Sequence, residues 1–516
     1  MTPRPARAVA ALATAVAALI GGCASPSGST ADAADYPQDR ELVIGLAAAL
    51  ASLDPAQANT QRTEGNVLTS VYSTLTRVDP DGELEGDLAT SWSQPDPNTW
   101  VFEIRDGVTF TNGDPLGPEQ VAWGIERYFD PELGTKGTTA IPTFESATVD
   151  DQGRVVVRTS APNFEVPQHF EQFYLVDPVV ADSGNLAAEP VGSGPYILDS
   201  YDPQGEIELV RNDDYYGETP YFEKVTFRVI PEEASRIAAL RAGEVDLVGS
   251  LDPQSLKQLT DVDSLVTGSV DGIRTHFVLF DARTGPFADE RVRLAAAHAI
   301  DTQAIADSIF EGLVDPGVYI NEGTPGFDPA ITPYEYDPDR ARALLAEAGY
   351  PDGIDVEFLN APGSYAGDDL TVQAAVAQLA EVGIRASIKN LPYTTYLEYV
   401  FGTDPAKQPS ALNFRSYGGT SAATVAASRY RIAQTGARGS FFSDPTYDAL
   451  LEQAQNAQSA EEQDAIYRRA NRLLHDKAVV LPLFNEPVVY AYARGLEWTP
   501  RGEQWLRPYD IRPAGD

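Results

Sequence analysis

The sequence predicts a protein of mixed α and β class, in which helices pack on sheets. Runs of β-branched and aromatic residues that indicate strands recur along the chain, and other segments combine capping residues with an apolar stripe, as helices do. In the second half these two patterns alternate. The hydrophobic fraction, 43%, is that of an ordinary globular protein, and 516 residues suffice for more than one domain.

The strand patterns follow one another through the first half of the chain. Residues 41–46 have the composition of a first strand. Residues 99–104 and 108–110 flank Asp106 and Gly107, a turn signature that predicts a β-hairpin. Later runs rich in β-branched residues predict further strands at 153–159, 207–210 and 224–230.

The predicted helices are recognised by their ends. Asp337 is a typical N-cap, Pro338 occupies the first helical position, and Gly349 follows the last residue of an apolar stripe. Residues 443–445 contain a second proline start, and residues 459–462 form a capping-box sequence before another stripe. These signals predict helices in the second half of the chain.

The first residues have the features of a secretory signal. A short basic head precedes the apolar run 8–20, which is shorter than the roughly 20 residues of a bilayer span. Small residues lead to Cys23, the only cysteine. This part resembles a bacterial lipobox, which implies that residues 1–22 are a lipoprotein signal peptide and that Cys23 is lipidated. An ordinary signal with an incidental cysteine is the alternative. The small, polar composition of residues 23–38 predicts a flexible tether.

The composition is strongly acidic, with 76 acidic against 37 basic residues and a net charge of −39. Phosphate backbones repel such a chain, so we expect no binding of nucleic acid. Anionic membrane surfaces do not attract it either, and membrane attachment would depend on the lipid at Cys23. The charge indicates solubility and identifies no ligand.

Motifs of catalysis are not apparent. The four histidines lack H-E-x-x-H spacing, and the sequence contains no G-x-S-x-G, Walker A or strand-to-helix G-x-G-x-x-G pattern. The sequence shows no cluster of histidines or cysteines of the kind that a nickel or other metal site requires. We expect no catalytic residue, no metal and no cofactor. A hydrolase with an acidic pair remains an alternative, since any two of the 76 acids could mimic one.

Short sequence blocks carry a further argument through their order. The blocks are residues 53–56, 71–82, 88–92, 102–110, 192–196, 210–217, 239–247, 289–293, 299–301, 447–451 and 481–484. In this order they resemble the peptide/nickel family of ABC-transporter extracellular solute-binding proteins, family 5, which includes dipeptide- and oligopeptide-binding members. The joint order of these blocks over nearly the whole mature chain is specific.

The resemblance implies a periplasmic-binding-protein-like (type II) clamshell of two lobes with an extra N-terminal subdomain. Lobe I would comprise residues 39–272, with the subdomain at about 65–185, and a C-terminal return at 479–516. Lobe II would comprise residues 282–475. The strands that cross between the lobes would lie near 275–279 and 480–484, and the lobes would close on the ligand.

The candidate ligand contacts, named with the resemblance in view, are Asn59, His276, Arg415, Tyr417, Gly418, Phe484 and Asn485. The alternatives are a histidine satisfied between the lobes for His276, a surface arginine for Arg415, and a turn or cap role for Asn59 and Asn485. Peptide-binding members place an aromatic residue and then an Asp in a loop of the second lobe, where the carboxylate pairs with the peptide ammonium. This chain has no acid between Phe414 and Arg438. Either another acid takes that role or the ligand lacks a free amine, and Arg415 could instead meet a carboxylate or phosphate.

These observations together predict an extracytoplasmic lipoprotein, monomeric and anchored to the outer face of the cell membrane. It would bind an oligopeptide or peptide-like solute and deliver it to an ABC permease and its ATPase, without being an enzyme. The alternatives are a secreted hydrolase acting on peptides or glycans, and a ligand receptor of the same fold that does not transport.

Overall fold

The computed structural model describes most of the chain after the predicted signal. The described residues are 36–37, 39–57, 61–80, 82–135, 137–202, 205–402, 411–419 and 421–515. The predicted signal peptide, Cys23, nearly all of the predicted tether and Asn59 lie outside the described residues. Among the described residues, no helix combines the length and the apolar composition that crossing a membrane would require.

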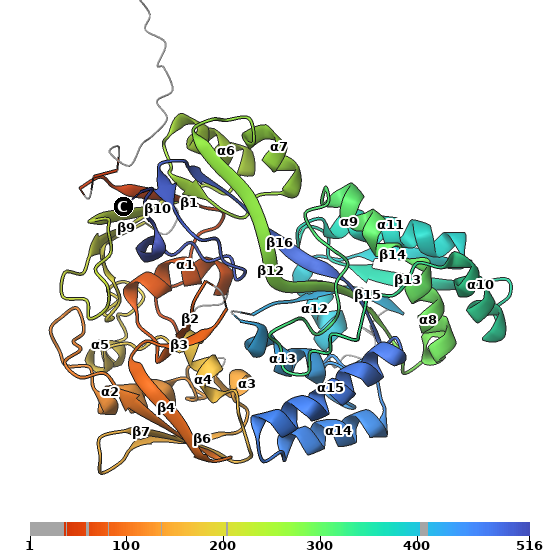
Figure 1. Cartoon of the computed structure of the whole chain (residues 1–516), viewed down its shortest axis with the longest axis horizontal. Coiled ribbons are helices and arrows are strands. Elements are labelled where there is room, and N and C mark those ends of the chain that lie inside the picture. The colour runs from red at the N-terminus through yellow and green to blue at the C-terminus, as the bar shows by residue number, and fades with distance from the viewer. Residues whose placement is uncertain are drawn as a thin grey trace, which may run out of the picture.

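A ten-stranded mixed sheet passes through both halves of the molecule (Figure 1). Its strands in spatial order are β14 (Ile384–Asn390), β13 (Ile354–Asn360), β15 (Leu412–Tyr417), β12 (Leu265–Phe280), β16 (Val480–Ala493), β11 (Leu247–Val248), β1 (Leu42–Leu46), β10 (Lys224–Val229), β9 (Glu206–Arg211) and β8 (Tyr196–Tyr201).

The long strands β12 and β16 join the two halves. They pair antiparallel from Leu265 opposite Ala493 to Leu279 opposite Val480, and the register shifts between Asp271 and Thr275. Figure 1 shows β12 and β16 extending from one half of the molecule to the other. We call the paired segment around Thr275 and Asn485 the crossover.

Lobe II contains three parallel strands, β13, β14 and β15, beside the crossover. One face of this part of the sheet carries a core formed with α8 (Glu290–Ala299), α9 (Thr302–Ile309), α10 (Pro338–Glu347) and α11 (Asp368–Glu381). The other face packs against α13 (Ala422–Arg431), α14 (Pro445–Gln455) and α15 (Ala460–Asp476). Helix α12 (Tyr393–Phe401) covers the end of β13.

Lobe I has its own cores on the strands β1, β8, β9, β10 and β11. They contain residues of α1 (Gln61–Val71), α6 (Glu233–Ala242) and α7 (Leu256–Leu259), and of the C-terminal segment with β17 (Leu496–Glu497) and β18 (Arg512–Pro513). Gly192 and Gly194 press against α1: a Cβ on either residue would lie 2.2–2.5 Å from a backbone oxygen of Ser70 or Val71. Glycine is therefore required there for close packing.

The extra subdomain is built on a four-stranded antiparallel sheet in the order β4 (Ala89–Asp96), β5 (Thr99–Ile104), β7 (Val155–Thr159) and β6 (Phe144–Val149). Its core also contains residues of α2 (Pro118–Arg127) and α4 (Val166–His169), and α3 (Gly137–Ala140) and α5 (Pro178–Ser183) lie beside it. The short hairpin of β2 (Thr76–Val78) and β3 (Leu84–Gly86) leads into it. The domain boundaries given above stay predictions.

The predicted hairpin of residues 99–104 and 108–110 is wrong. Strand β5 pairs with β4 on one side and β7 on the other, while Thr109 forms only an isolated bridge with Pro115. The chain does turn at Asp106 and Gly107, but both edges of β5 are paired with β4 and β7, which are longer than the segment 108–110. The predicted strands near 41–46, 153–159, 207–210 and 224–230 are confirmed as β1, β7, β9 and β10.

The predicted helix starts are confirmed. The Asp337 carboxylate accepts from the Arg340 backbone N–H at 2.8 Å, and Ser459 Oγ accepts from the Glu462 N–H at 3.1 Å. The capping box at Ser459 is incomplete, because the Glu462 carboxylate accepts from the N–H of Gln458. Gly349 has φ +92°, a left-handed conformation that favours glycine at the end of α10.

Candidate ligand-binding site

The carboxyl ends of parallel strands from both lobes converge on the crossover. Strands β1, β10 and β11 run parallel in lobe I, as do β13, β14 and β15 in lobe II. In open α/β sheets, ligands bind in the crevice outside these carboxyl ends. The loops after β11, β13 and β15 are therefore the first place to look for a ligand site.

An interlobe cavity of about 540 Å³ lies there, within the usual range for small-molecule sites. Lobe I contributes residues 250–254 after β11, together with Gln504. Lobe II contributes residues 363–370 after β13 and the end of α9. Residues 486–489 of β16 complete the wall, so both lobes and a crossing strand surround one space.

The interlobe cavity is acidic. Its lining contains Asp252, Asp368, Asp369 and Glu486, and none of the described lining residues is Lys, Arg or His. The Asp368 carboxylate accepts from four backbone N–H groups, including those of Gly363 and Asp369, and so holds the loop in place. Burial, and then the neighbouring carboxylate of Glu233, raises the pKa of Asp252. A cationic group near Asp252 would favour its charged form.

Glu486 lies at the crossover and is only 3% exposed. Its Oε2 is 3.2 Å from Nε of Arg274 and 3.7 Å from Nε2 of His276. A buried carboxylate needs such a cation nearby. The guanidinium of Arg274 also lies 5.6 Å from the ring centroid of Tyr365, another residue of the cavity wall.

A hinge cavity of about 450 Å³ lies beside Asn485. Asn485 lines this cavity, whereas the next residues of the same strand, 486–489, line the interlobe cavity, so the two cavities adjoin successive residues of β16. Its other walls are residues 271–273 of β12, the lobe II segment from Val314 to Phe327, and α13.

Polar side chains join β12, β16 and lobe II at the hinge cavity. Thr275 Oγ1 donates to Asn485 Oδ1 at 2.8 Å, and Asn321 Nδ2 lies 2.9 Å from the same oxygen. Arg429 Nη2 donates to Thr275 Oγ1 at 2.7 Å. These contacts fix the crossing strands relative to α13.

The structure brings three of the predicted contact residues to the crossover. Asn485 lines the hinge cavity. Tyr417 and Gly418 are half-buried at the end of β15, where the Tyr417 ring lies 5.5 Å from that of Phe277. A Cβ on Gly418 would lie 3.0 Å from the Cβ of Arg274, so the residue packs directly on the crossing strand.

The other described residues of the prediction are buried: His276 and Phe484 in the crossing strands and Arg415 in β15. His276 and Phe484 have no exposed surface, and their rings are 5.3 Å apart. Neither ring nitrogen of His276 has a hydrogen-bond partner among the described residues. The guanidinium of Arg415 is buried between the rings of Phe401 and Phe441, at 5.2 and 4.1 Å, and lines neither cavity. Their contact with ligand stays a prediction.

Sequence reasoning missed Glu486, Asn321 and Arg429. One signal could have found the first: Asn485 and Glu486 are adjacent polar residues in the otherwise apolar strand β16. No spacing marks the other two residues. Asn321 comes from a long connection and Arg429 from a helix whose face is known only after folding.

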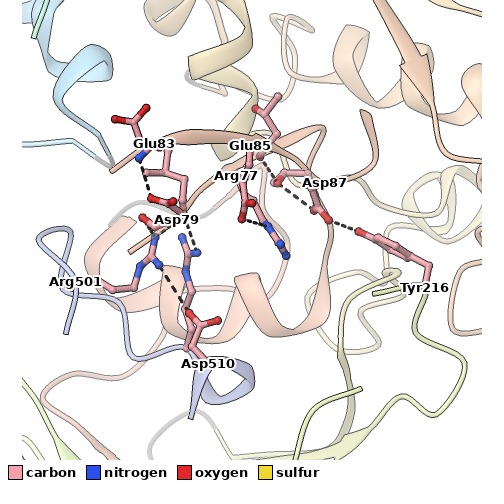
Figure 2. Close-up of polar contacts among 12 residues, drawn as sticks. Arg77, Asp79, Glu83, Glu85, Asp87, Tyr216, Arg501 and Asp510 are labelled. Carbon is pink, nitrogen blue, oxygen red and sulfur yellow. Dashed lines mark hydrogen bonds and ion pairs between the residues drawn. The ribbon is translucent and has the colours of Figure 1, made fainter. Parts of the chain in front are cut away.

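A further polar cluster surrounds a cavity of about 330 Å³ in lobe I, between the β2–β3 hairpin and the C-terminal segment (Figure 2). Arg77 pairs with Glu85 at 2.7 Å, Arg501 Nη1 lies 3.8 Å from Asp510, and Tyr216 donates to Asp87. The cations of this cluster are largely matched by neighbouring carboxylates. We interpret it as the joint that fastens the C-terminal segment to the hairpin.

Comparison with known proteins decides the family. Residues 83–447, more than half of the chain, match the model described as bacterial extracellular solute-binding proteins, family 5. The chain belongs to this family. The resemblance stated from the sequence blocks is thereby confirmed, and so is the expected two-lobed type II fold.

Individual members of family 5 match along nearly the whole length. The glutathione-binding protein GsiB of Salmonella typhi is 24% identical over 475 residues, which cover 89% of this chain and 91% of that protein. DppA of Helicobacter pylori, solved with the peptide STSA, superposes with a TM-score of 0.75 at 23% identity, covering 93% of this chain and 99% of that one. CtaP of Listeria monocytogenes gives 0.82 at 19% identity, with coverage of 92% and 99%.

Membership of family 5 makes this chain an extracytoplasmic solute-binding protein of the ABC-transporter type. Such relatives are binding proteins and not enzymes. Among the described residues, no group of three or more His, Cys, Asp or Glu side chains is arranged to hold a metal ion.

Proposed function

We propose that the chain is the lipid-anchored receptor of an ABC importer and that it delivers a small peptide or peptide-like solute to the permease and its ATPase. Family membership is the observation that carries this proposal. The cavities at the crossover support it, because they offer room for a small solute where the lobes meet. Closure of the lobes would bury the solute and present the closed form to the permease.

The choice of a peptide-like solute is supported by the relatives. GsiB is named as a glutathione-binding protein, and DppA was solved with a peptide. The absence of an acid between Phe414 and Arg438 does not weigh against an ammonium group, because exposed or partly exposed carboxylates line both cavities. Another acid can therefore take the role that the family gives to the loop.

The proposed attachment is through Cys23, with the following small polar residues as tether and the folded chain acting as a monomer outside the membrane. Substitution of Cys23 by Ser should move the protein from the membrane fraction to the soluble fraction. Continued sedimentation of that variant with membranes would contradict a lipid anchor at this residue.

Mass spectrometry of the native protein, purified without denaturation, is the main test. We expect one bound solute per chain, identified after release. A thermal-shift screen of short peptides, glycosides and phosphorylated solutes should show a raised unfolding midpoint with the matching class, because a ligand that binds only the folded state stabilises it. No product should appear when the same mixtures are followed by chromatography. Turnover of a peptide or glycan would point to a hydrolase. A failure of all three solute classes to bind would contradict the proposal.

A further inference from the structure

Two residues with a left-handed backbone lie in the wall of the interlobe cavity. Among the described residues, only four residues other than glycine have φ in the left-handed region, and Ser250 (φ +53°) and Gln504 (φ +72°) are two of them. Both line the interlobe cavity from lobe I. They belong to separate segments, the loop after β11 and the C-terminal segment, so no single turn accounts for both. A third, Glu311, follows Phe310 of the lobe II wall.

The left-handed conformation is unfavourable for both residues. A Cβ in this region comes too close to the following carbonyl oxygen, whereas glycine adopts the region freely. This chain places glycine at comparable positions, such as Gly243 and Gly349 after helices. Strain of this kind persists only where the surrounding structure enforces it, and it gathers at ligand sites. A side chain at positions 250 and 504 therefore has a use that outweighs the strain.

Buried arginines hold both strained segments in place. Arg236 is 3% exposed and donates from Nη2 to the Ser250 carbonyl at 2.9 Å. Arg501 is 2% exposed and donates from Nη2 to the Val78 carbonyl at 2.5 Å. The carbonyl of Arg501 in turn accepts from the Gln504 N–H at 3.0 Å. Each left-handed residue is thus bonded to a well-fixed arginine.

The residues after Gln504 anchor the C-terminal segment to α1. The Leu506 N–H donates to Asn66 Oδ1 at 2.6 Å. Trp505 packs so closely on the helix that a Cβ on Gly65 would lie 2.0 Å from Trp505 Nε1. The segment is therefore fixed on both sides of Gln504, and its backbone has no room to relax into an unstrained conformation.

The side chains of the two strained residues are uncharged and available to a ligand. Ser250 is exposed, Gln504 is half-buried, and neither side chain has a hydrogen-bond partner among the described residues. A hydroxyl donates and accepts, and a carboxamide offers two donors and an acceptor. Such groups pair well with an uncharged group that also has a donor and an acceptor, as a peptide group does.

We propose that Ser250 and Gln504 are specificity-determining contacts for the transported solute, and that their left-handed backbone places both side chains against it. The chemical class that they recognise is an uncharged group with a donor and an acceptor, which in a peptide-like solute is a peptide group. This inference rests on the proposed function, because it takes the occupant of the interlobe cavity to be the transported solute.

Substitution by glycine separates a solute contact from a structural role. Gln504→Gly removes both the carboxamide and the strain. The thermal midpoint of the solute-free protein should therefore rise by about 1 °C. The Kd for a pool of tripeptides, measured by calorimetric titration, should increase about tenfold, which is about 1.4 kcal/mol. Ser250→Gly should change both quantities in the same directions, with a smaller increase in Kd because a hydroxyl makes fewer hydrogen bonds.

Two further variants complete the series. Gln504→Ala removes the carboxamide but keeps a Cβ in the left-handed region, so Kd should increase as in Gln504→Gly without a gain in the thermal midpoint. It also serves as the test if Gln504→Gly fails to fold. Gln453→Ala is the matched control: Gln453 is an exposed glutamine of α14 that lines neither cavity, and its loss should leave Kd unchanged.

Ester analogues test the chemical class. Two pools of the same tripeptides carry an ester in place of the first or the second peptide group, and so lack one N–H donor. We expect one of these pools to bind the wild-type protein about fivefold more weakly than the peptides. That ratio should fall to about one in Gln504→Ala, because the acceptor of the lost hydrogen bond is already absent.

An unchanged Kd in both glycine variants would overturn the role of Ser250 and Gln504 as solute contacts, and a lower thermal midpoint in both would overturn the strain account. An ester ratio that survives in Gln504→Ala would contradict recognition of the peptide group by this residue. If tripeptides failed to bind while another solute class bound, the peptide-group assignment would fail and the solute-binding function would stand. If no class bound, the proposed function would fail, and this inference with it.

Discussion

Glu165 lies next to a contact between the extra subdomain and lobe II. It precedes α4, and its neighbour Phe164 packs against the lobe II core that contains Tyr430. Glu165 Oε1 is buried and has no hydrogen-bond partner among the described residues. Burial raises its pKa to about 7. The acid is therefore held neutral in the folded protein near pH 6, whereas an unfolded chain would ionise it.

The stability of the protein should fall between pH 4.5 and 7 on account of Glu165. In that window the unfolded state has lost the proton and the folded state still holds it, so the contribution of Glu165 to stability decreases as pH rises and is constant above pH 7. Glu165→Gln, neutral at every pH, should raise the thermal midpoint at pH 8 and change it little at pH 4.5. The gain in the free energy of unfolding at pH 8 should exceed that at pH 4.5 by about 1 to 3 kcal/mol. Glu132→Gln, an exposed position, is the control. Equal effects of Glu165→Gln at both pH values would contradict this account.

The helices show how far local chemistry fixes an element. Asp444 caps α14 by accepting from the N–H groups of Thr446 and Tyr447 at 2.8 and 3.2 Å, and it also pairs with Lys477 after α15. One residue thus starts a helix and ties it to the next. The two capping bonds follow from the residue types at the helix start, which is why this start could be predicted from the sequence.

Asp444→Ala should destabilise lobe II by about 1 to 2 kcal/mol, because it removes an N-cap. Loss of the Lys477 contact adds a smaller amount, since that lysine is partly exposed. Urea unfolding followed by circular dichroism measures the change. Glu452→Ala, an exposed position on the same helix, should stay within about 0.5 kcal/mol of the wild type. Similar losses in the two variants would argue against the capping role.

The whole molecule carries a net charge of −39, and this charge acts on all of its parts together. Like charges on a compact surface repel one another, and dissolved salt screens them. Added sodium chloride should therefore raise the thermal midpoint, with most of the gain below about 0.3 M, where the screening length becomes shorter than the spacing of surface charges. Sucrose without salt is the control for general solvent effects. A midpoint that falls as salt is added would show that attractive ion pairs outweigh the repulsion.

The sequence by itself determined the α and β class, the starts of α10, α14 and α15, several strands and the family. These features depend on neighbouring residues or on the order of blocks along the chain, both of which can be read without coordinates. The tertiary structure alone decided the pairing of β5, which depends on strands distant in the chain. It also decided that Arg415 and His276 are buried and that Arg429 lacks a carboxylate partner among the described residues. Burial and charge pairing are properties of non-local neighbours, so the residue types alone could not fix them.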